Sequence, residues 1–270
     1  MSWMLHHINV PALKVQETKA FLRDMIGLRE GQWTYPDRPG ELHHDEDSIA
    51  YFGTENRGLH VVRQVTSFAS DNGFMHNPTV GGHFAISVPD LAAVRSRLDA
   101  AGVLYSDAGV YAMAGVHQIY VYDSSFNVIE VNQTVAPLPE ATLEAQDSAA
   151  EIHIRQAAIP AQDIDASVTF FHELIGGDAP SVNADGAIFR SGDHAIRLTR
   201  VTSGYANGGS ADPAAREPYF TLAVSDLEAI KARLDGAAIP NSGLINEPVD
   251  GKDSVFTHAP GMRLMAIVQG

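Results

Sequence analysis

The stretch Val88-Pro-Asp-Leu-Ala-Ala-Val-Arg-Ser-Arg-Leu-Asp99 returns later in the chain as Val224-Ser-Asp-Leu-Glu-Ala-Ile-Lys-Ala-Arg-Leu-Asp235. In each copy an aspartate, Asp90 or Asp226, stands where a helix N-cap is expected, and aliphatic residues follow at spacings of three and four. Each copy therefore predicts the start of an amphipathic helix. The near-identity of the two segments indicates that the chain contains an internal repeat.

A second pair of similar segments lies upstream of these two. Residues 18–27 resemble residues 167–176, and both segments end in glycine, which is favoured just beyond the C-terminus of a helix. A short apolar or alternating run precedes each helix and predicts a strand, and about three further strand-like runs follow it. The strands that precede the four helices are expected at residues 7–10, 83–88, 153–158 and 219–224. The helices themselves are expected to begin near Gln16, Asp90, Ala166 and Asp226.

The repeating unit is thus one strand, one helix and about three strands, present four times. We predict an α+β fold of four βαβββ modules arranged as two domains. The first domain covers residues 1–135, with modules at about 1–75 and 78–135, and the second covers residues 151–270, with modules at about 151–210 and 215–270. Residues 136–150, rich in Ala, Glu and Pro, are expected to form the linker.

The composition excludes several classes of function. The chain has 270 residues, a net charge of −15 and no cysteine. Such an acidic chain repels phosphate backbones and anionic lipid, so we expect neither nucleic acid nor a membrane as partner. The N-terminus lacks the basic-then-apolar order of a signal peptide, and no run of apolar residues is long enough to span a membrane, so we expect a cytoplasmic protein. Without cysteine, a bound metal must be held by histidine and carboxylate.

Histidines recur at the same point of the repeat and are candidate metal ligands. His7 begins the first strand of module one, His83 begins the first strand of module two, and Glu130 lies on the last strand of module two. If the two modules pair about a pseudo-twofold axis, His7 and His83 face each other across one concave surface. Glu130 then completes a two-histidine, one-carboxylate triad with open positions for substrate or water.

The second half of the chain serves as an internal control for this assignment. His7 corresponds to Gln156, His83 to Tyr219, and Glu130 to about Met265. The three metal-binding residue types disappear together. The sequence therefore predicts one working half and one degenerate half.

These motifs resemble the vicinal oxygen chelate superfamily, which includes glyoxalase I, extradiol ring-cleaving dioxygenases, and fosfomycin-resistance and bleomycin-binding proteins. The similar segments are His7-Ile-Asn-Val with Phe21 and Ile26-Gly-Leu, and Gly82-His-Phe-Ala-Ile-Ser-Val with the later Ile119-Tyr-Val-Tyr-Asp. The resemblance implies that each pair of modules forms an incomplete barrel. It also implies that His7, His83 and Glu130 hold a divalent ion, with Fe(II) favoured and Mn, Ni, Co or Zn as alternatives, which chelates two neighbouring oxygens of a small-molecule substrate.

The resemblance suggests roles for three further residues. Tyr120, ten residues before Glu130, is similar to a tyrosine of the extradiol dioxygenases that contacts substrate or the oxygen intermediate. His76 is a candidate for the acid–base histidine of those enzymes, although it lies nearer to the following ligand than usual. His60 lies roughly where glyoxalase I has a fourth metal ligand. The competing interpretations are packing for Tyr120, a loop residue for His76 and a solvent-facing strand residue for His60.

The resemblance leaves three functions open. An extradiol-type dioxygenase is our first expectation, because four modules in one chain are typical of these enzymes, although their metal usually lies in the C-terminal half. A glyoxalase-like lyase or isomerase is the alternative, and a four-ligand site would favour it. The third is a non-catalytic binding protein of the bleomycin-resistance type, which needs no metal. A homodimer is compatible with all three, because a shared fold does not fix the reaction or the assembly.

Overall fold

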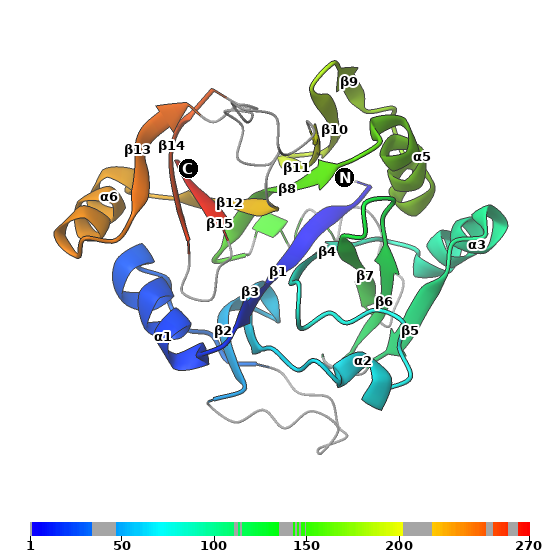
Figure 1. The fold of residues 1–270 in the computed structure, drawn as a ribbon, viewed down its shortest axis with the longest axis horizontal. Helices are drawn as coiled ribbons and strands as arrows, with labels where there is room; N and C mark the ends of the chain where they lie inside the picture. Colours follow the sequence, from blue (N-terminus) through cyan, green and yellow to red (C-terminus); the bar gives the residue numbers. More distant parts are fainter. Residues whose placement is uncertain are drawn as a thin grey trace.

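The structure is a computed structural model that describes residues 2–33, 47–110, 113, 115–134, 143, 145, 147–148, 150–201, 218–246, 251–258 and 264–270. It has a mixed α+β architecture with two mixed sheets, one in each half of the chain (Figure 1). Within the described ranges, no helix is long and apolar enough to cross a membrane.

The N-terminal sheet has seven strands in the order β2-β3-β1-β4-β7-β6-β5. The strands are β1 Met4–Ala12, β2 Ile49–Thr54, β3 Arg57–Arg63, β4 His83–Ser87, β5 Tyr105–Gly109, β6 Val116–Tyr122 and β7 Val128–Thr134. In each module the first strand pairs in parallel with the last, β1 with β3 and β4 with β7, and the first strands β1 and β4 pair antiparallel in the middle. This pairing confirms the predicted pseudo-twofold arrangement of two βαβββ modules.

The C-terminal sheet repeats this plan with eight strands in the order β13-β14-β15-β12-β8-β11-β10-β9. Its central strands β8 and β12 pair antiparallel, as β1 and β4 do. In neither sheet do the described edge strands pair with one another, so both barrels are incomplete. The strands are β8 His153–Ala161, β9 Ser181–Asn183, β10 Gly186–Ser191, β11 His194–Arg200, β12 Tyr219–Val224, β13 Asn241–Asn246, β14 Asp253–His258 and β15 Leu264–Gln269.

The described helices are α1 Val15–Ala20, which continues as the π-helix η1 Phe21–Ile26, then α2 Phe68–Asp71, α3 Leu91–Ala101, α5 Ile164–Ile175 and α6 Leu227–Gly236. The predicted N-caps are confirmed, because the Asp90 carboxylate accepts a hydrogen bond from the Ala93 amide and Asp226 does the same for Ala229, each at 2.9 Å. The third module follows the same rule, although the sequence placed its helix start too late. Asp163 caps α5 and accepts from Ala166 at 3.0 Å, so Ala166 lies inside the first turn.

Helices from different halves of the chain pack against each other, α3 against α5 and α6 against η1 (Figure 1). At the first contact Arg97 Nε donates to the carbonyl of Glu173 at 2.6 Å, and at the second Arg233 Nε donates to the carbonyl of Met25 at 2.7 Å. Both arginines occupy the same position of the repeat, and both reach carbonyls in the last turn of the helix they contact, which have no partner within that helix. Gly27, which ends η1 with a φ of +86°, lies against Arg233, where an added Cβ would be 3.2 Å from the guanidinium.

The central strand β1 is buried on both faces, and its alternation separates core from site. Ile8 and Val10 belong to a hydrophobic cluster that includes side chains of both sheets, such as Ile159 and Ile196. Residues at odd positions of the same stretch, beginning with His7, point to the opposite face. The shared core fixes β1, and β1 in turn presents polar side chains to the concave face of the N-terminal sheet.

Candidate metal centre

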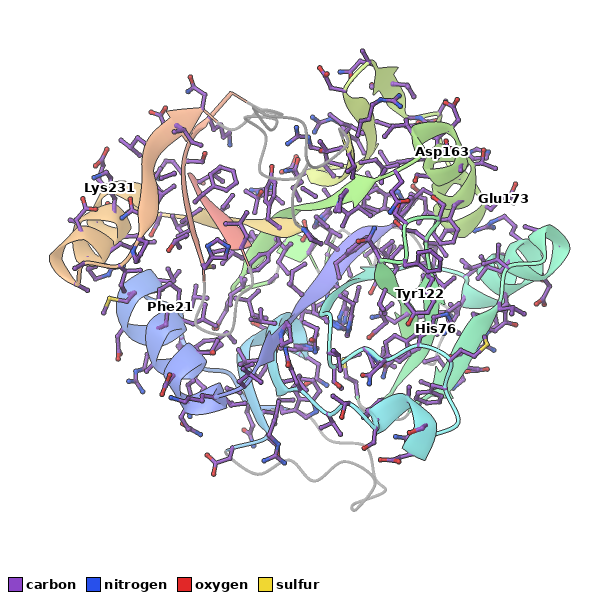
Figure 2. All side chains as sticks on the ribbon, in the orientation of Figure 1. Phe21, His76, Tyr122, Asp163, Glu173 and Lys231 are labelled. Carbon is purple, nitrogen blue, oxygen red and sulfur yellow. The ribbon has the colours of Figure 1, made fainter. Side chains whose placement is uncertain are left out.

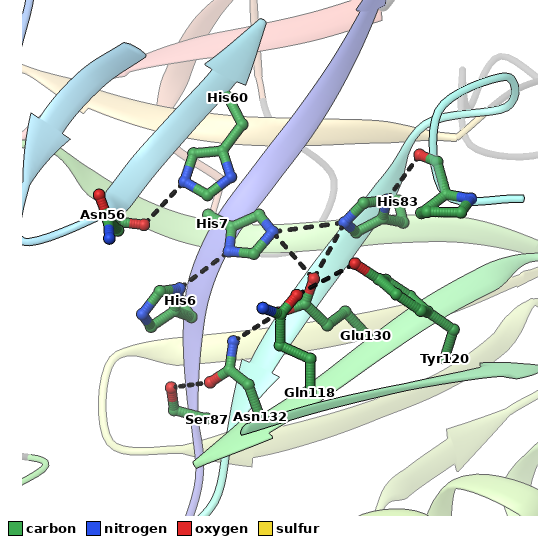
Figure 3. A network of polar contacts seen from close by, with 11 residues as sticks. His6, His7, Asn56, His60, His83, Ser87, Gln118, Tyr120, Glu130 and Asn132 are labelled. Carbon is green, nitrogen blue, oxygen red and sulfur yellow. Dashed lines mark hydrogen bonds and ion pairs between the residues drawn. The ribbon is translucent and has the colours of Figure 1, made fainter. Parts of the chain in front are cut away.

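The strand register brings the three predicted metal ligands onto one face of the N-terminal sheet. His7 of β1 lies opposite Ala85 of β4, and Ala85 lies opposite Glu130 of β7. Directly opposed residues share a face, as do residues two apart on a strand, so His83 joins them. Ala85 is the smallest side chain of this row, which leaves space between His7 and Glu130 where the three ligand atoms meet (Figure 3).

The candidate ligand atoms form a nearly equilateral triangle. His7 Nε2 lies 3.3 Å from His83 Nε2, and each of these nitrogens lies 3.4 Å from Glu130 Oε2. Two atoms bound to one metal at about 2.1 Å are separated by about 3.0 to 3.4 Å between octahedral and tetrahedral angles. The triangle therefore has the size of three ligands on one side of a single divalent ion, and all three residues are buried.

The tautomer of His83 gives an independent reason for a cation here. His83 Nδ1 lies 2.9 Å from the carbonyl oxygen of Pro78, which can only accept, so Nδ1 carries the proton. In the neutral ring, Nε2 then carries a lone pair that is directed at the Glu130 carboxylate. Two electron-rich groups at that distance repel each other unless a cation lies between them, so the residues present fit a metal ion.

Each ligand is also held by a second side chain or backbone group, as is usual for metal ligands. Pro78 orients His83, and the Asn132 amide donates to Glu130 Oε1 at 2.8 Å. The Nδ1 atom of His7 lies 2.8 Å from Nδ1 of His6 (Figure 3). These partners lock the rings and the carboxylate in the orientation in which Nε2, Nε2 and Oε2 converge.

The protonation states suit metal binding. Burial lowers the pKa of His83, although Glu130 opposes this, so its imidazole is neutral at physiological pH. Burial alone would raise the pKa of Glu130, but the neighbouring His7 and His83 hold it well below its usual range. A neutral imidazole and an ionised carboxylate are the forms that bind metals.

His6 owes its position to a β-bulge that the sequence does not reveal. Leu5 pairs with Ile86 and His7 with Ala85, so His6 is an extra residue in β1. Bulges increase local twist and redirect side chains, and this one buries His6 beside His7. Burial lowers the pKa of His6 well below its usual value, which keeps it neutral.

A cavity of about 60 Å³ lies over the triad, and its wall is mainly apolar. Two buried polar atoms on the wall, Asn9 Oδ1 and Gln118 Nε2, have no hydrogen-bond partner among the described residues. A buried unpaired acceptor and donor beside a metal centre are suited to a bound oxygen-containing ligand. The apolar part of the wall is formed by Trp33, Ile49, Val62, Phe68, Pro78 and Met113.

Tyr120 lines this cavity, and its predicted contact with substrate stays a prediction. Its ring meets the His83 ring edge-on at a centroid distance of 5.6 Å, and its hydroxyl donates to Gln118 Oε1 at 3.1 Å. Tyr120 pairs directly with Glu130 across β6 and β7, which explains why ten residues of separation bring it to the site.

His76 lies at a different place from the one its predicted role requires. Its Nδ1 is 2.7 Å from Ser106 Oγ, and its ring contacts Tyr122 (Figure 2). It is buried rather than exposed in a loop, and it is absent from the described residues that line the cavity. The structure therefore does not bring His76 to the triad, and its acid–base role stays a prediction.

His60 lines the cavity but does not join the triangle. Its ring stacks on the His7 ring at a centroid distance of 3.8 Å, and its Nε2 lies 2.7 Å from the carbonyl of Asn56. The group of described ligand atoms within 4.8 Å of one another consists of His7, His83 and Glu130. A fourth ligand at His60 stays a prediction, which requires rotation of a ring that burial keeps neutral by lowering its pKa well below the usual value.

The corresponding face of the C-terminal sheet carries a different set of residues. Gln156 Nε2 and an Arg197 nitrogen both donate to the Tyr219 hydroxyl, at 3.4 and 3.0 Å. The register pairs Thr221 with Ala266, as Ala85 pairs with Glu130. The predicted correspondence of Glu130 to about Met265 was thus wrong by one residue, and the equivalent position is Ala266.

Residues that complete the site but were absent from the sequence prediction are His6, Asn9 and Gln118. Asn9 follows His7 by two residues in an alternating strand, and Gln118 precedes Tyr120 by two, so period-2 alternation was a usable signal for both. No comparable signal existed for His6, because a bulge interrupts that alternation.

Comparison with known proteins supports the fold through structure alone. No protein-family model matches the sequence, and no curated protein matches it at a significant level. Among solved structures, the Mn(II)-bound glyoxalase from Novosphingobium aromaticivorans is similar at a TM-score of 0.65 and 16% identity, over 98% of this chain and 81% of that one. The 2,3-dioxygenase LapB from Pseudomonas sp. KL28 is similar at a TM-score of 0.64 and 16% identity, over 99% of this chain and 92% of that one.

Homoprotocatechuate 2,3-dioxygenase from Arthrobacter globiformis is similar at a TM-score of 0.62 and 13% identity, over 100% of this chain and 80% of that one. The glyoxalase and the two extradiol dioxygenases are members of the vicinal oxygen chelate superfamily. The paired βαβββ modules of this chain have the fold of that superfamily.

Proposed function

We propose that the protein is a metal-dependent enzyme, and specifically an extradiol-type dioxygenase that cleaves a ring carrying two neighbouring hydroxyl groups. The observation that carries the proposal is the triangle of His7, His83 and Glu130 ligand atoms at 3.3 to 3.4 Å. Tyr120 beside His83 and the similarity to extradiol dioxygenase structures favour this reaction over others of the superfamily.

The metal ion would be held by His7, His83 and Glu130, and Fe(II) suits two imidazoles and one carboxylate with open positions. When bound, it would act as a Lewis acid on two adjacent substrate oxygens. Asn9 Oδ1 would accept a hydrogen bond from a substrate hydroxyl, and Gln118 Nε2 would donate one to a substrate oxygen. The Tyr120 hydroxyl, which now donates to Gln118, would stay within the same network and orient that amide.

The cavity wall suggests the class of substrate. Apart from the histidines and Glu130, the described lining residues carry no charge, so the substrate is expected to be uncharged beyond its chelating oxygens. A benzene-sized ligand fills a cavity of about 150 Å³. The cavity over the triad is smaller than this, so we expect wall side chains such as Phe68 to move when a ring binds.

A glyoxalase-like isomerase is the second candidate, and the position of His60 is what favours it. His60 lines the same cavity and stacks on His7, so a rotated His60 would supply a fourth ligand. In that case Glu130 would move a proton on a carbon next to a carbonyl, with no need of oxygen.

The test begins with protein purified without oxygen or chelator, and its metal content is measured. The Fe(II)-loaded protein is then mixed with a panel of uncharged and carboxylated catechols while oxygen uptake is followed. Near-stoichiometric iron or manganese, with oxygen consumption for uncharged catechols that is lost in His83→Ala, supports the dioxygenase. Solvent deuterium exchange next to a carbonyl under anaerobic conditions, without oxygen uptake, supports the isomerase. Absence of bound metal under all loading conditions overturns both and favours a non-catalytic binding protein.

A further inference from the structure

The C-terminal sheet has a cavity beside the position that corresponds to the candidate metal centre of the N-terminal sheet. Gln156 lies opposite Thr221, just as His7 lies opposite Ala85. Arg190 lies two strands further along the same row, opposite Ala195, which itself lies opposite Gln156. The cavity has a volume of about 260 Å³, and Gln156, Thr221 and Arg190 all line it.

The charged side chains around this cavity are mostly cationic. Arg155, Arg190 and Lys252 line it, against a single carboxylate, Asp193. Arg155 donates to Asp193 at 2.6 Å, so one positive charge is partly compensated and the described lining keeps a net positive charge. In a chain with a net charge of −15, such a local excess of positive charge departs from the general surface.

A β-bulge places Arg155 at the cavity, just as a β-bulge positions His6 in the N-terminal half. The pairing of β8 with β12 shifts by one residue, with Gln156 opposite Thr221 and Ile154 opposite Leu222, so Arg155 is the extra residue of a β-bulge. The bulge is thus present in both halves, with a histidine beside the metal ligands in one and an arginine beside the cavity in the other.

A buried hydroxyl inside the cavity lacks a partner. Thr221 is 3% exposed, and its Oγ1 has no hydrogen-bond partner among the described residues. A buried hydroxyl without a partner is unfavourable unless a ligand or water completes it. Gln156, which is 4% exposed, lies beside it on the same wall. A hydroxyl, an amide, two guanidinium groups and an ammonium group together form a donor set for an oxyanion.

We propose that this cavity binds a small oxyanion, the carboxylate or phosphate group of a small molecule, at a site separate from the metal centre. Thr221 and Gln156 would bind the anion at the buried end of the cavity. Arg190 and Lys252 would supply charge-assisted hydrogen bonds from the rim, and Arg155 would contribute from its pair with Asp193.

The test uses calorimetric titration of the metal-loaded full chain with inorganic phosphate and, separately, with acetate at constant ionic strength. The variants are Arg190→Gln and Thr221→Val, and the matched control is Arg29→Gln. That control removes the same charge from a side chain that is 84% exposed and is not among the lining residues. His83→Ala serves as a second control, because it removes a metal ligand in the other half.

We expect saturable binding of at least one anion near one per chain, weakened about tenfold or more by Arg190→Gln and by Thr221→Val. Arg29→Gln and His83→Ala should leave the affinity within about twofold, since neither residue lines the cavity. Saturation by phosphate alone identifies a phosphate-bearing ligand, and saturation by acetate identifies a carboxylate. Absence of saturable binding by either anion up to about 10 mM overturns the proposal. Equal weakening by Arg29→Gln also overturns the proposal, because binding would then depend on net charge. Loss of binding in His83→Ala overturns it too, because the anion would then bind at the metal.

Discussion

The Nδ1 atoms of His6 and His7 lie 2.8 Å apart, although the two residues are neighbours in one strand. Successive side chains of a regular strand point to opposite faces, so this contact exists only because of the bulge in β1. His6 thereby holds the ring nitrogen of His7 that does not face Glu130, and it sets the orientation of the ligand nitrogen.

Replacing His6 should weaken metal binding without removing a ligand. We expect His6→Ala to lower the affinity for the ion by about tenfold to a hundredfold, the usual effect of losing the group that orients a ligand. Competition with a metallochromic chelator measures this, and His117→Ala, at an exposed position of β6, is the matched control. Unchanged affinity in His6→Ala would show that His7 is oriented without it.

Removing a ligand should abolish metal binding and leave the fold intact. We expect His83→Ala to lose stoichiometric metal while keeping its circular dichroism spectrum, because the shared hydrophobic core does not include the ligands. Gln156→Ala, at the position that corresponds to His7, should bind metal as the wild type does. Metal analysis after gel filtration checks both variants, and retention of one ion per chain by His83→Ala would refute the assigned triad.

Tyr120 and His76 can be separated by kinetics, because only Tyr120 is among the described cavity-lining residues. We expect Tyr120→Phe to lower kcat by about tenfold or more, with metal content unchanged, since it removes the hydroxyl that orients Gln118. If His76 is the acid–base group, His76→Gln should lower kcat and remove one limb of the pH profile. An effect on thermal stability alone would assign His76 to packing against Ser106 and Tyr122.

The metal-free protein should lose stability on acidification. Burial holds the pKa values of His6 and His60 well below 6.5 in the folded chain, so the unfolded chain binds more protons as pH falls below about 6.5. The free energy of unfolding should therefore be highest above about pH 6.5 and should decrease as the pH falls below that value. Thermal melts of chelator-treated protein at pH 7.5 and 5.5 measure the effect. His60→Phe, which keeps a ring against His7, should flatten the dependence, and an equally steep dependence in that variant would contradict the assignment.

Much of the fold followed from local signals in the sequence. The repeated segments that begin with Asp90 and Asp226 contain both a cap and a helical spacing, and each forms the predicted helix. The start of α5 was placed near Ala166, whereas the helix begins at Ile164, directly after its cap Asp163.

The triad was predictable because its residues recur at equivalent positions of a repeat, and because period-2 strands place His7, His83 and Glu130 on one face. Roles that depend on long-range register were not predictable to the same degree. The equivalence of Glu130 to Ala266, and not to Met265, follows from the alignment of β12 with β15, and the position of His76 beside Ser106 follows from the path of the segment between α2 and β4. Bulges and loop paths determine that alignment, and neither has a reliable signature in a single sequence.

The arginines that join the two halves should contribute measurably to stability. We expect Arg97→Ala to lower the free energy of unfolding by about 1 to 3 kcal/mol, because it leaves carbonyls at the end of α5 without their charged donor. Arg233→Ala should cost about 1 kcal/mol, since that side chain is more exposed. Urea unfolding measures both, with Arg23→Ala as the control at a surface ion pair. Equal stability of Arg97→Ala and wild type would show that helix packing alone joins the halves.

This reciprocal capping also bears on how the two halves differ in chemistry. Arg97 contacts the end of α5, and Arg233 contacts the end of η1 in the equivalent way. These two contacts are related as in a twofold symmetric dimer, although both lie within one polypeptide chain. In a true homodimer every substitution appears twice, and a ligand lost from one site is lost from both. Within one chain each sheet can change alone. The C-terminal sheet therefore has Gln156, Tyr219 and Ala266 where the N-terminal sheet has its candidate ligands, while it still contributes to the hydrophobic core that the two halves share.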